Sequence, residues 1–174
     1  MDKIVIYDTE TSNSHIFGSI IEFGAVVVDK NLNEISKFNI RGRLPEGEVP
    51  SAKALLVNST SIDLLTKGNY SHYEFIAAIE NFFLKISPAC FIGWGNTNFD
   101  RKLIHSNFFR SNRYPYSSHT SPNQETDGLH IARAAQTLDS DTLKTGLTDA
   151  GNVSLALESL ATEQGFNTDA QHTA

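Results

Sequence analysis

The sequence has 174 residues, 40% hydrophobic and 20% charged, a composition that excludes a disordered chain and predicts one globular domain with a real core. The formal net charge of −6 does not indicate a protein that coats nucleic acid through its overall charge. Cys90 is the only cysteine, which excludes an intrachain disulfide and a cysteine-based zinc site, and we expect its thiol to be buried and inert. Without a signal peptide or an apolar run long enough to cross a membrane, we expect a cytoplasmic protein that binds no membrane.

The apolar, β-branched run from Lys3 to Tyr7 predicts a buried strand, and Asp8 and Glu10 follow it in an Asp-x-Glu pattern. Side chains two residues apart on a strand share a face, so two carboxylates would lie side by side where the strand leaves the core. Burying like charges together is costly, and a hard divalent cation such as magnesium would remove that cost. The pattern also fits a solvated strand end, or an aspartate that caps the next turn.

Residues 20–29 and 35–41 predict two further strands, which would form an antiparallel meander with the first. A loop with two prolines over 42–50 follows. Ser71 and Glu74 then match a capping box and predict the start of a helix. Apolar residues recur behind the box at helical spacing and should face the core: Phe75, Ile79, Phe82, Phe83 and Ile86.

The second half of the chain predicts one more strand and several helices. The strand covers 90–93 and is followed by a helix over 98–112 and a polar loop through Gln124. Helices are also predicted over 131–135 and 154–164, the last of them stopped by the next glycine. A meander followed by alternating strands and helices predicts an α/β or α+β domain with a mixed sheet.

The segment from Gly93 to Asp100 connects the predicted fourth strand to a helix. Asp100 would lie in the first helical turn, where the helix dipole favours a negative charge. There it could deliver a third carboxylate to the sheet end that carries Asp8 and Glu10. An ordinary N-terminal acid after a glycine turn is the structural alternative, since the segment lacks a GxGxxG motif and a Walker lysine.

The stretch from Arg101 to Gln124 contains four basic residues and no acidic one, with aromatic residues between them. Basic side chains interleaved with stacking aromatics are typical of surfaces that bind single-stranded nucleic acid. Core packing of Phe108 or Phe109, and a solvated face for the arginines, are the structural alternatives. The basic residues are Arg101, Lys102, Arg110 and Arg113, and the other aromatic residues are Tyr114 and Tyr116.

Taken together, these motifs resemble the DEDD-type, or DnaQ-like, 3′→5′ exonucleases, and within them the bacterial exonuclease I group. The similarity rests on Asp-x-Glu in the first strand, Asn-x-x-Phe-Asp ending at Asp100, and a late histidine, His172. It extends over nearly the whole chain, and further similar segments are 92–100, 107–110, 114–116, Leu44-Pro45 and 157–160. The resemblance implies an exonuclease domain over residues 1–174 with a ribonuclease-H-like α/β fold, in which helices flank a mixed sheet.

The resemblance also implies a metal-dependent hydrolase that releases nucleoside 5′-monophosphates from the 3′ end of single-stranded DNA. Asp8, Glu10 and Asp100 match three of four carboxylates that bind two Mg²⁺ or Mn²⁺ ions. His172 matches the general base, and Asp127 matches a supporting acid near the site. The residues that we expect to contact the substrate are Thr11, Asn96, Phe99, Arg101, Arg110 and Arg113.

Two features depart from the family pattern. The fourth carboxylate would fall five residues after His172, beyond Ala174, together with the final helix of the domain. We therefore expect a chain that is cut within the last motif, impaired in activity and prone to associate with itself. At 57–61, where the family has a glycine and an apolar residue that contacts the terminal base, Thr60 would be a weaker wedge. An RNA-directed exonuclease of the same superfamily and an inactive nucleic-acid- or partner-binding remnant are the alternatives.

Overall fold

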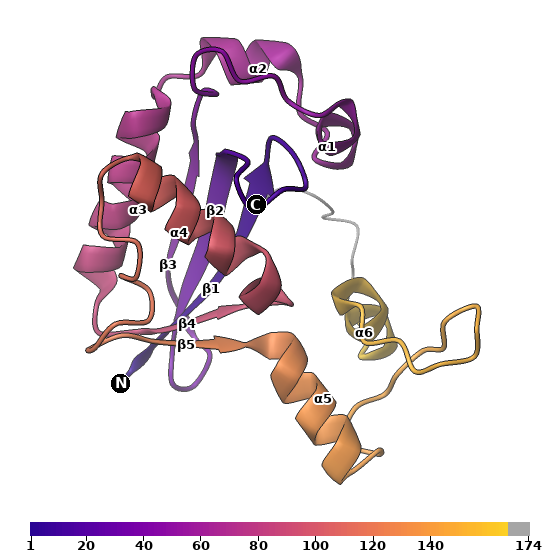
Figure 1. Ribbon diagram of the computed structural model, residues 1–174. Helices are drawn as coiled ribbons and strands as arrows, with labels where there is room; N and C mark the ends of the chain where they lie inside the picture. The colour runs from indigo at the N-terminus through magenta and orange to yellow at the C-terminus, as the bar shows by residue number, and fades with distance from the viewer. Residues whose placement is uncertain (167–174) are drawn as a thin grey trace.

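The computed structural model describes residues 1–166, and its strands form one five-stranded mixed sheet in the order β3-β2-β1-β4-β5 (Figure 1). β1 and β3 each pair with β2 in the antiparallel direction, whereas β4 is parallel to both β1 and β5. The predicted α/β class with a mixed sheet is confirmed. The strands are β1 (Lys3–Thr11), β2 (Ile20–Asp29), β3 (Glu34–Arg41), β4 (Cys90–Gly93) and β5 (Gln124–Asp127).

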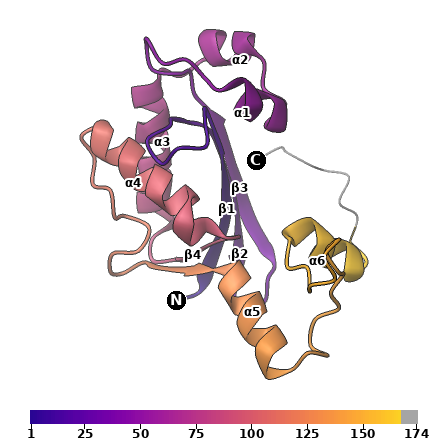
Figure 2. The same cartoon turned by 45° about the vertical axis from the view of Figure 1, so that its right-hand side comes forward.

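Helices lie on both sides of this sheet, with α3 and α4 on one side and α6 on the other (Figure 2). Within residues 1–166, no helix is both long enough and apolar enough to span a bilayer. The helices are α1 (Ala52–Val57), α2 (Ile62–Lys67), α3 (His72–Ile86), α4 (Asp100–Arg110), α5 (Gly128–Leu138) and α6 (Leu157–Glu163), with a single 3₁₀ turn, η1, at Asn96–Asn98.

Local sequence explains where α3 begins. The Ser71 side chain accepts a hydrogen bond from the Glu74 backbone N–H, and the Glu74 carboxylate accepts one from the Ser71 backbone N–H. This reciprocal arrangement is the predicted capping box, which satisfies donors that a helix end leaves without partners. Phe75, Ile79 and Phe83 then lie one turn apart on the buried face of the helix.

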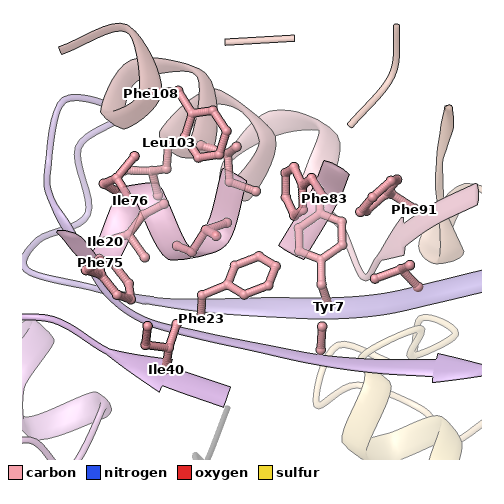
Figure 3. Close-up of a cluster of buried hydrophobic side chains, with 14 of the residues drawn as sticks. Tyr7, Ile20, Phe23, Ile40, Phe75, Ile76, Phe83, Phe91, Leu103 and Phe108 are labelled. Carbon is pink, nitrogen blue, oxygen red and sulfur yellow. The ribbon is translucent and has the colours of Figure 1, made fainter. Parts of the chain in front are cut away.

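The core lies between the sheet and the pair α3 and α4, and aromatic rings fill much of it (Figure 3). The Phe83 ring centroid lies 4.8 Å from that of Phe91 and 5.7 Å from that of Phe23. Phe23 in turn stacks on Tyr7 at 5.8 Å. These contacts fix the core face of β1, which alternates with the face that carries Asp8 and Glu10.

Three elements differ from the sequence-based expectation. The polar segment Gln-Glu-Thr-Asp has no apolar alternation and is not predicted as a strand, yet it forms β5 and pairs with β4 along its whole length. The sequence also does not predict α1 and α2, since each has only six residues. Cys90 is only partly buried, contrary to the expected buried thiol, although burial still raises the pKa of that thiol.

Phe108 and its neighbour Phe109 provide a test of this core. Phe108 is 0% exposed and Phe109 is 76% exposed. Replacing Phe108 by alanine should lower the free energy of unfolding by about 3–5 kcal/mol because it leaves a cavity. Phe109→Ala should change it by less than about 0.5 kcal/mol. Urea denaturation of both variants measures the difference, and equal losses would contradict the core assignment.

Candidate active site

The candidate site begins on the face of β1 that α3 and α4 do not cover. Asp8 and Glu10 point to this face, and Ile6, which shares it, is 48% exposed. On β2, Gly24 lies opposite Asp8 and Glu22 lies opposite Glu10. The predicted pair of neighbouring carboxylates is therefore present, and Glu22 adds a third carboxylate from the next strand.

Glu10 occupies an environment that disfavours its charge. The residue is only 8% exposed, and burial is the largest cause that raises the pKa of its carboxyl to about 7, followed by the negative charges of Asp8 and Glu22. The positive charge of Arg41 lowers the pKa of Glu10, and Arg41 also forms an ion pair with Glu22. Sequence analysis missed Glu22 and Arg41 because their pairing across β2 and β3 is a long-range contact.

Asp100 reaches the same region from the first turn of α4, as predicted. The turn before it contains Gly95 with φ of +67°, a conformation that costs glycine little. The Asp100 Oδ1 atom accepts a hydrogen bond of 2.5 Å from the Thr9 hydroxyl. Burial raises the pKa of Asp100 to about 6; the Thr9 hydrogen bond lowers it, and the charge of Asp8 raises it further.

The three predicted ligands share one end of β1, but in residues 1–166 no three His, Cys, Asp or Glu side chains are arranged to hold a metal ion. Mutual repulsion gives a physical reason for carboxylates to stay apart when they have no cation between them. The donor set nevertheless fits a hard divalent cation, since it includes carboxylates whose pKa values are raised by burial and by neighbouring negative charge. Metal binding by Asp8, Glu10 and Asp100 stays a prediction.

Asp127 anchors the loop that leads to Asp100. Its carboxylate accepts hydrogen bonds from the backbone N–H groups of Gly95 and Leu129, both 2.9 Å, and of Thr97 at 3.2 Å. Burial alone would raise the pKa of Asp127, but these bonds outweigh it and hold the pKa below its usual range. The residue that was predicted as a supporting acid thus connects the start of α5 to the segment before Asp100.

A second buried network lies under the same loop. The Tyr7 hydroxyl donates to Glu125 Oε1 at 2.6 Å, and Asn96 Nδ2 donates to the Tyr7 hydroxyl at 2.8 Å. Asn96 is almost fully buried and helps to link β1, η1 and β5, while its contact with substrate stays a prediction. Sequence analysis had no signal for Glu125, because β5 itself was not predicted.

A small pocket of about 210 Å³ opens beside Glu10. One wall is the end of β1, including Thr11, and the other is α1 with Lys53; Phe99 also lines it. Thr11 and Phe99, both predicted to contact substrate, therefore lie next to a predicted metal ligand. Thr60, expected to be a weaker wedge, is buried, and its hydroxyl donates to the Asn58 carbonyl at 3.1 Å.

The three arginines that are predicted to contact the substrate have different surroundings. Arg110 donates to the Gly18 carbonyl at 3.1 Å, and Arg113 forms an ion pair with Glu80. Arg110 and Arg113 therefore link distant parts of the chain. Arg101 makes a local contact, since it donates to the Thr97 carbonyl at 3.5 Å. Their roles in substrate binding stay predictions, as does the role of His172, which falls outside the described residues.

No protein-family model matches this chain, but the chain is similar to proteins named exodeoxyribonuclease I. Exodeoxyribonuclease I of Buchnera aphidicola subsp. Schizaphis graminum is 27% identical over 139 residues, which cover 78% of this chain and 29% of that protein. The protein of the same name from Buchnera aphidicola subsp. Acyrthosiphon pisum is 26% identical over 139 residues and is covered to 33%. The chain spans about a third of the length of these relatives.

Solved structures that resemble this chain are also of exonuclease I. E. coli exonuclease I in complex with a dT13 oligonucleotide superposes with a TM-score of 0.92 at 22% identity, over 100% of this chain and 38% of the other. This chain has the exonuclease I nuclease fold. A product-bound structure of exonuclease I matches with a TM-score of 0.89 at 23% identity, over 98% of this chain and 40% of the other. The predicted resemblance to exonuclease I is confirmed.

The raised pKa of Glu10 predicts how stability depends on pH in the metal-free protein. Between about pH 4.5 and 7 the folded state retains a proton that the unfolded state has lost, so the free energy of unfolding should fall as pH rises. One such group contributes a slope of at most about 1.4 kcal/mol per pH unit. Denaturation in EDTA should show this slope in the unaltered protein and a weaker one in Glu10→Gln. The control Glu46→Gln should keep the slope of the unaltered protein. If Glu10→Gln kept it as well, the raised pKa of Glu10 would be contradicted.

The hydrogen bonds to Asp127 predict a second result. Asp127→Ala leaves three backbone N–H groups without this acceptor and should lower the free energy of unfolding by about 1–3 kcal/mol. Asp149 lies exposed in a turn, so Asp149→Ala should have little effect. Thermal denaturation compares the two variants at neutral pH. Equal stability of the two would show that Asp127 does not anchor the loop.

Proposed function

We propose that the chain is the nuclease part of a metal-dependent 3′→5′ exonuclease that releases nucleoside 5′-monophosphates from single-stranded DNA. The observation that carries the proposal is that the Asp100 carboxylate accepts a hydrogen bond from Thr9, the residue between Asp8 and Glu10, in a chain with the exonuclease I fold. Further support comes from the relatives named exodeoxyribonuclease I and from the oligonucleotide bound to E. coli exonuclease I.

The three carboxylates would hold divalent cations, Mg²⁺ or Mn²⁺. When bound, such ions polarise a phosphoryl group and lower the pKa of a bound water. Burial and like charge disfavour the ionised forms of Glu10 and Asp100, so the positive charge of a cation would restore them at neutral pH. His172 would take the proton from the attacking water.

The pocket beside Glu10 would receive the 3′-terminal nucleotide. It offers an apolar surface on Phe99, polar groups on Thr11 and Asn13, and the positive charge of Lys53. Arg101, at the start of α4 next to Asp100, would contact the phosphate backbone of the strand. Arg110, Arg113 and Asn96 would act indirectly, because they fix the elements around the pocket.

The direct experiment uses a single-stranded DNA oligonucleotide labelled at its 5′ end, incubated with the protein and MgCl₂. We expect a ladder of labelled products that shorten from the 3′ end, together with unlabelled nucleoside 5′-monophosphates. EDTA should stop the reaction. A labelled mononucleotide as the first product, or equal activity in excess EDTA, would contradict the proposal.

Asp8→Asn tests the metal ligands within the same assay. It keeps the size of the side chain but removes its charge, so turnover should fall by about a hundredfold or more while the melting temperature is unchanged or higher. Asp141, exposed after α5, provides the control Asp141→Asn, which should retain full activity. Turnover that survives in Asp8→Asn would exclude this carboxylate from catalysis, and cleavage confined to an RNA oligonucleotide would exclude the DNA substrate.

A further inference from the structure

Helix α1 lies near the end of the sheet where β1 finishes (Figure 1), and its apolar residues are only partly buried or exposed. None of its six residues is buried, and Leu56 is 81% exposed. Helices in proteins are normally stabilised by an apolar face packed on the core, and a six-residue helix is too short to be stable by itself. With only Ala54 and Leu55 partly buried, polar contacts at the two ends of α1 contribute to holding it in place.

Hydrogen bonds to β1 and its extension flank α1 at both ends. Before the helix, the Ser51 backbone N–H donates to the Ser12 carbonyl at 2.8 Å. After it, the Asn58 side-chain amide donates to the Thr11 carbonyl, also at 2.8 Å. Thr11 and Ser12 directly follow Glu10, so both bonds fasten the helix to the strand end that bears the predicted metal ligands.

The Asn58 side chain is well suited to this contact. It is 7% exposed, and the bond to Thr11 links residues 47 positions apart in the chain. The acceptor lies where the pairing of β1 with β2 shifts register, between Glu10 and Thr11. A buried amide that loses its partner is costly, so the bond resists movement of the helix end away from β1.

The hydrogen bond between Asn58 and Thr11 joins two residues that line the 210 Å³ pocket. α1 contributes Lys53 and Val57 to one wall, and β1 contributes Thr9, Glu10 and Thr11 to the other. Asn58 lines the pocket too and connects the two walls. We propose that Asn58 is a positioning residue: its amide holds α1 against Thr11 and thereby sets the width of the pocket that receives the terminal nucleotide, a role that rests on the proposed function.

Asn58→Ala and Asn58→Asp test the proposal together. Alanine removes the side chain, whereas aspartate keeps its size but cannot donate to the Thr11 carbonyl. Asn81, exposed on α3, provides the control Asn81→Ala. In hydrogen–deuterium exchange of the protein without DNA, both Asn58 variants should exchange the peptide covering residues 51–60 about tenfold faster, with peptides from β1 and β2 unchanged.

Steady-state kinetics on single-stranded DNA with Mg²⁺ then distinguish a role of Asn58 in positioning α1 from a general loss of structure in the variants. KM should rise about tenfold in both Asn58 variants, as expected for the loss of one buried hydrogen bond, while kcat changes less than about twofold. Unchanged exchange, or faster exchange with an unchanged KM, would overturn the positioning role while the nuclease activity stands. An inactive unaltered protein would instead contradict the proposed function, and the positioning role with it.

Discussion

β4 pairs with β1 only from Ile4 to Ile6, although β1 continues to Thr11. The second half of β1 therefore has a neighbouring strand on one side only, and the chain that leaves β4 must turn away beside it. The segment 93–99 makes that turn, and Asp100 arrives at the free edge of β1 next to Thr9. Because β1 extends beyond β4, its free edge has room for Asp100, which comes from a distant part of the sequence, beside Thr9.

The same arrangement is electrostatically unfavourable without a counter-charge. Asp8, Glu10 and Glu22 share one region of the sheet, and only Arg41 opposes their charge among the groups that influence Glu10 most. The surrounding fold holds the strand and loop in place through buried or partly buried hydrogen bonds: Tyr7 to Glu125, the backbone N–H groups to Asp127, and Asn58 to Thr11. Rigid support of repelling ligands is what a site for a divalent cation requires.

The sequence predicts the parts of this site that depend on local pattern. Strand alternation predicts Asp8 and Glu10 on one face, and the helix start predicts Asp100 in a first turn. Local pattern cannot predict Glu22 beside Glu10, because that contact depends on the β1–β2 register. It also cannot predict β5, whose polar residues form a strand only because β4 offers a parallel edge. At 57–61 the sequence draws attention to Thr60, but the side chain that donates a hydrogen bond to β1 is that of Asn58.

We propose that Asp8, Glu10 and Asp100 bind divalent cations together. Crystals of the protein soaked with MnCl₂ and a short single-stranded oligonucleotide test it most directly, because anomalous scattering locates manganese without reference to activity. We expect a manganese peak at ligand distance, about 2.2 Å, from oxygens of all three carboxylates, with Asp100 released from Thr9. Manganese bound elsewhere, or three carboxylates that stay separate at saturating MnCl₂, would contradict it.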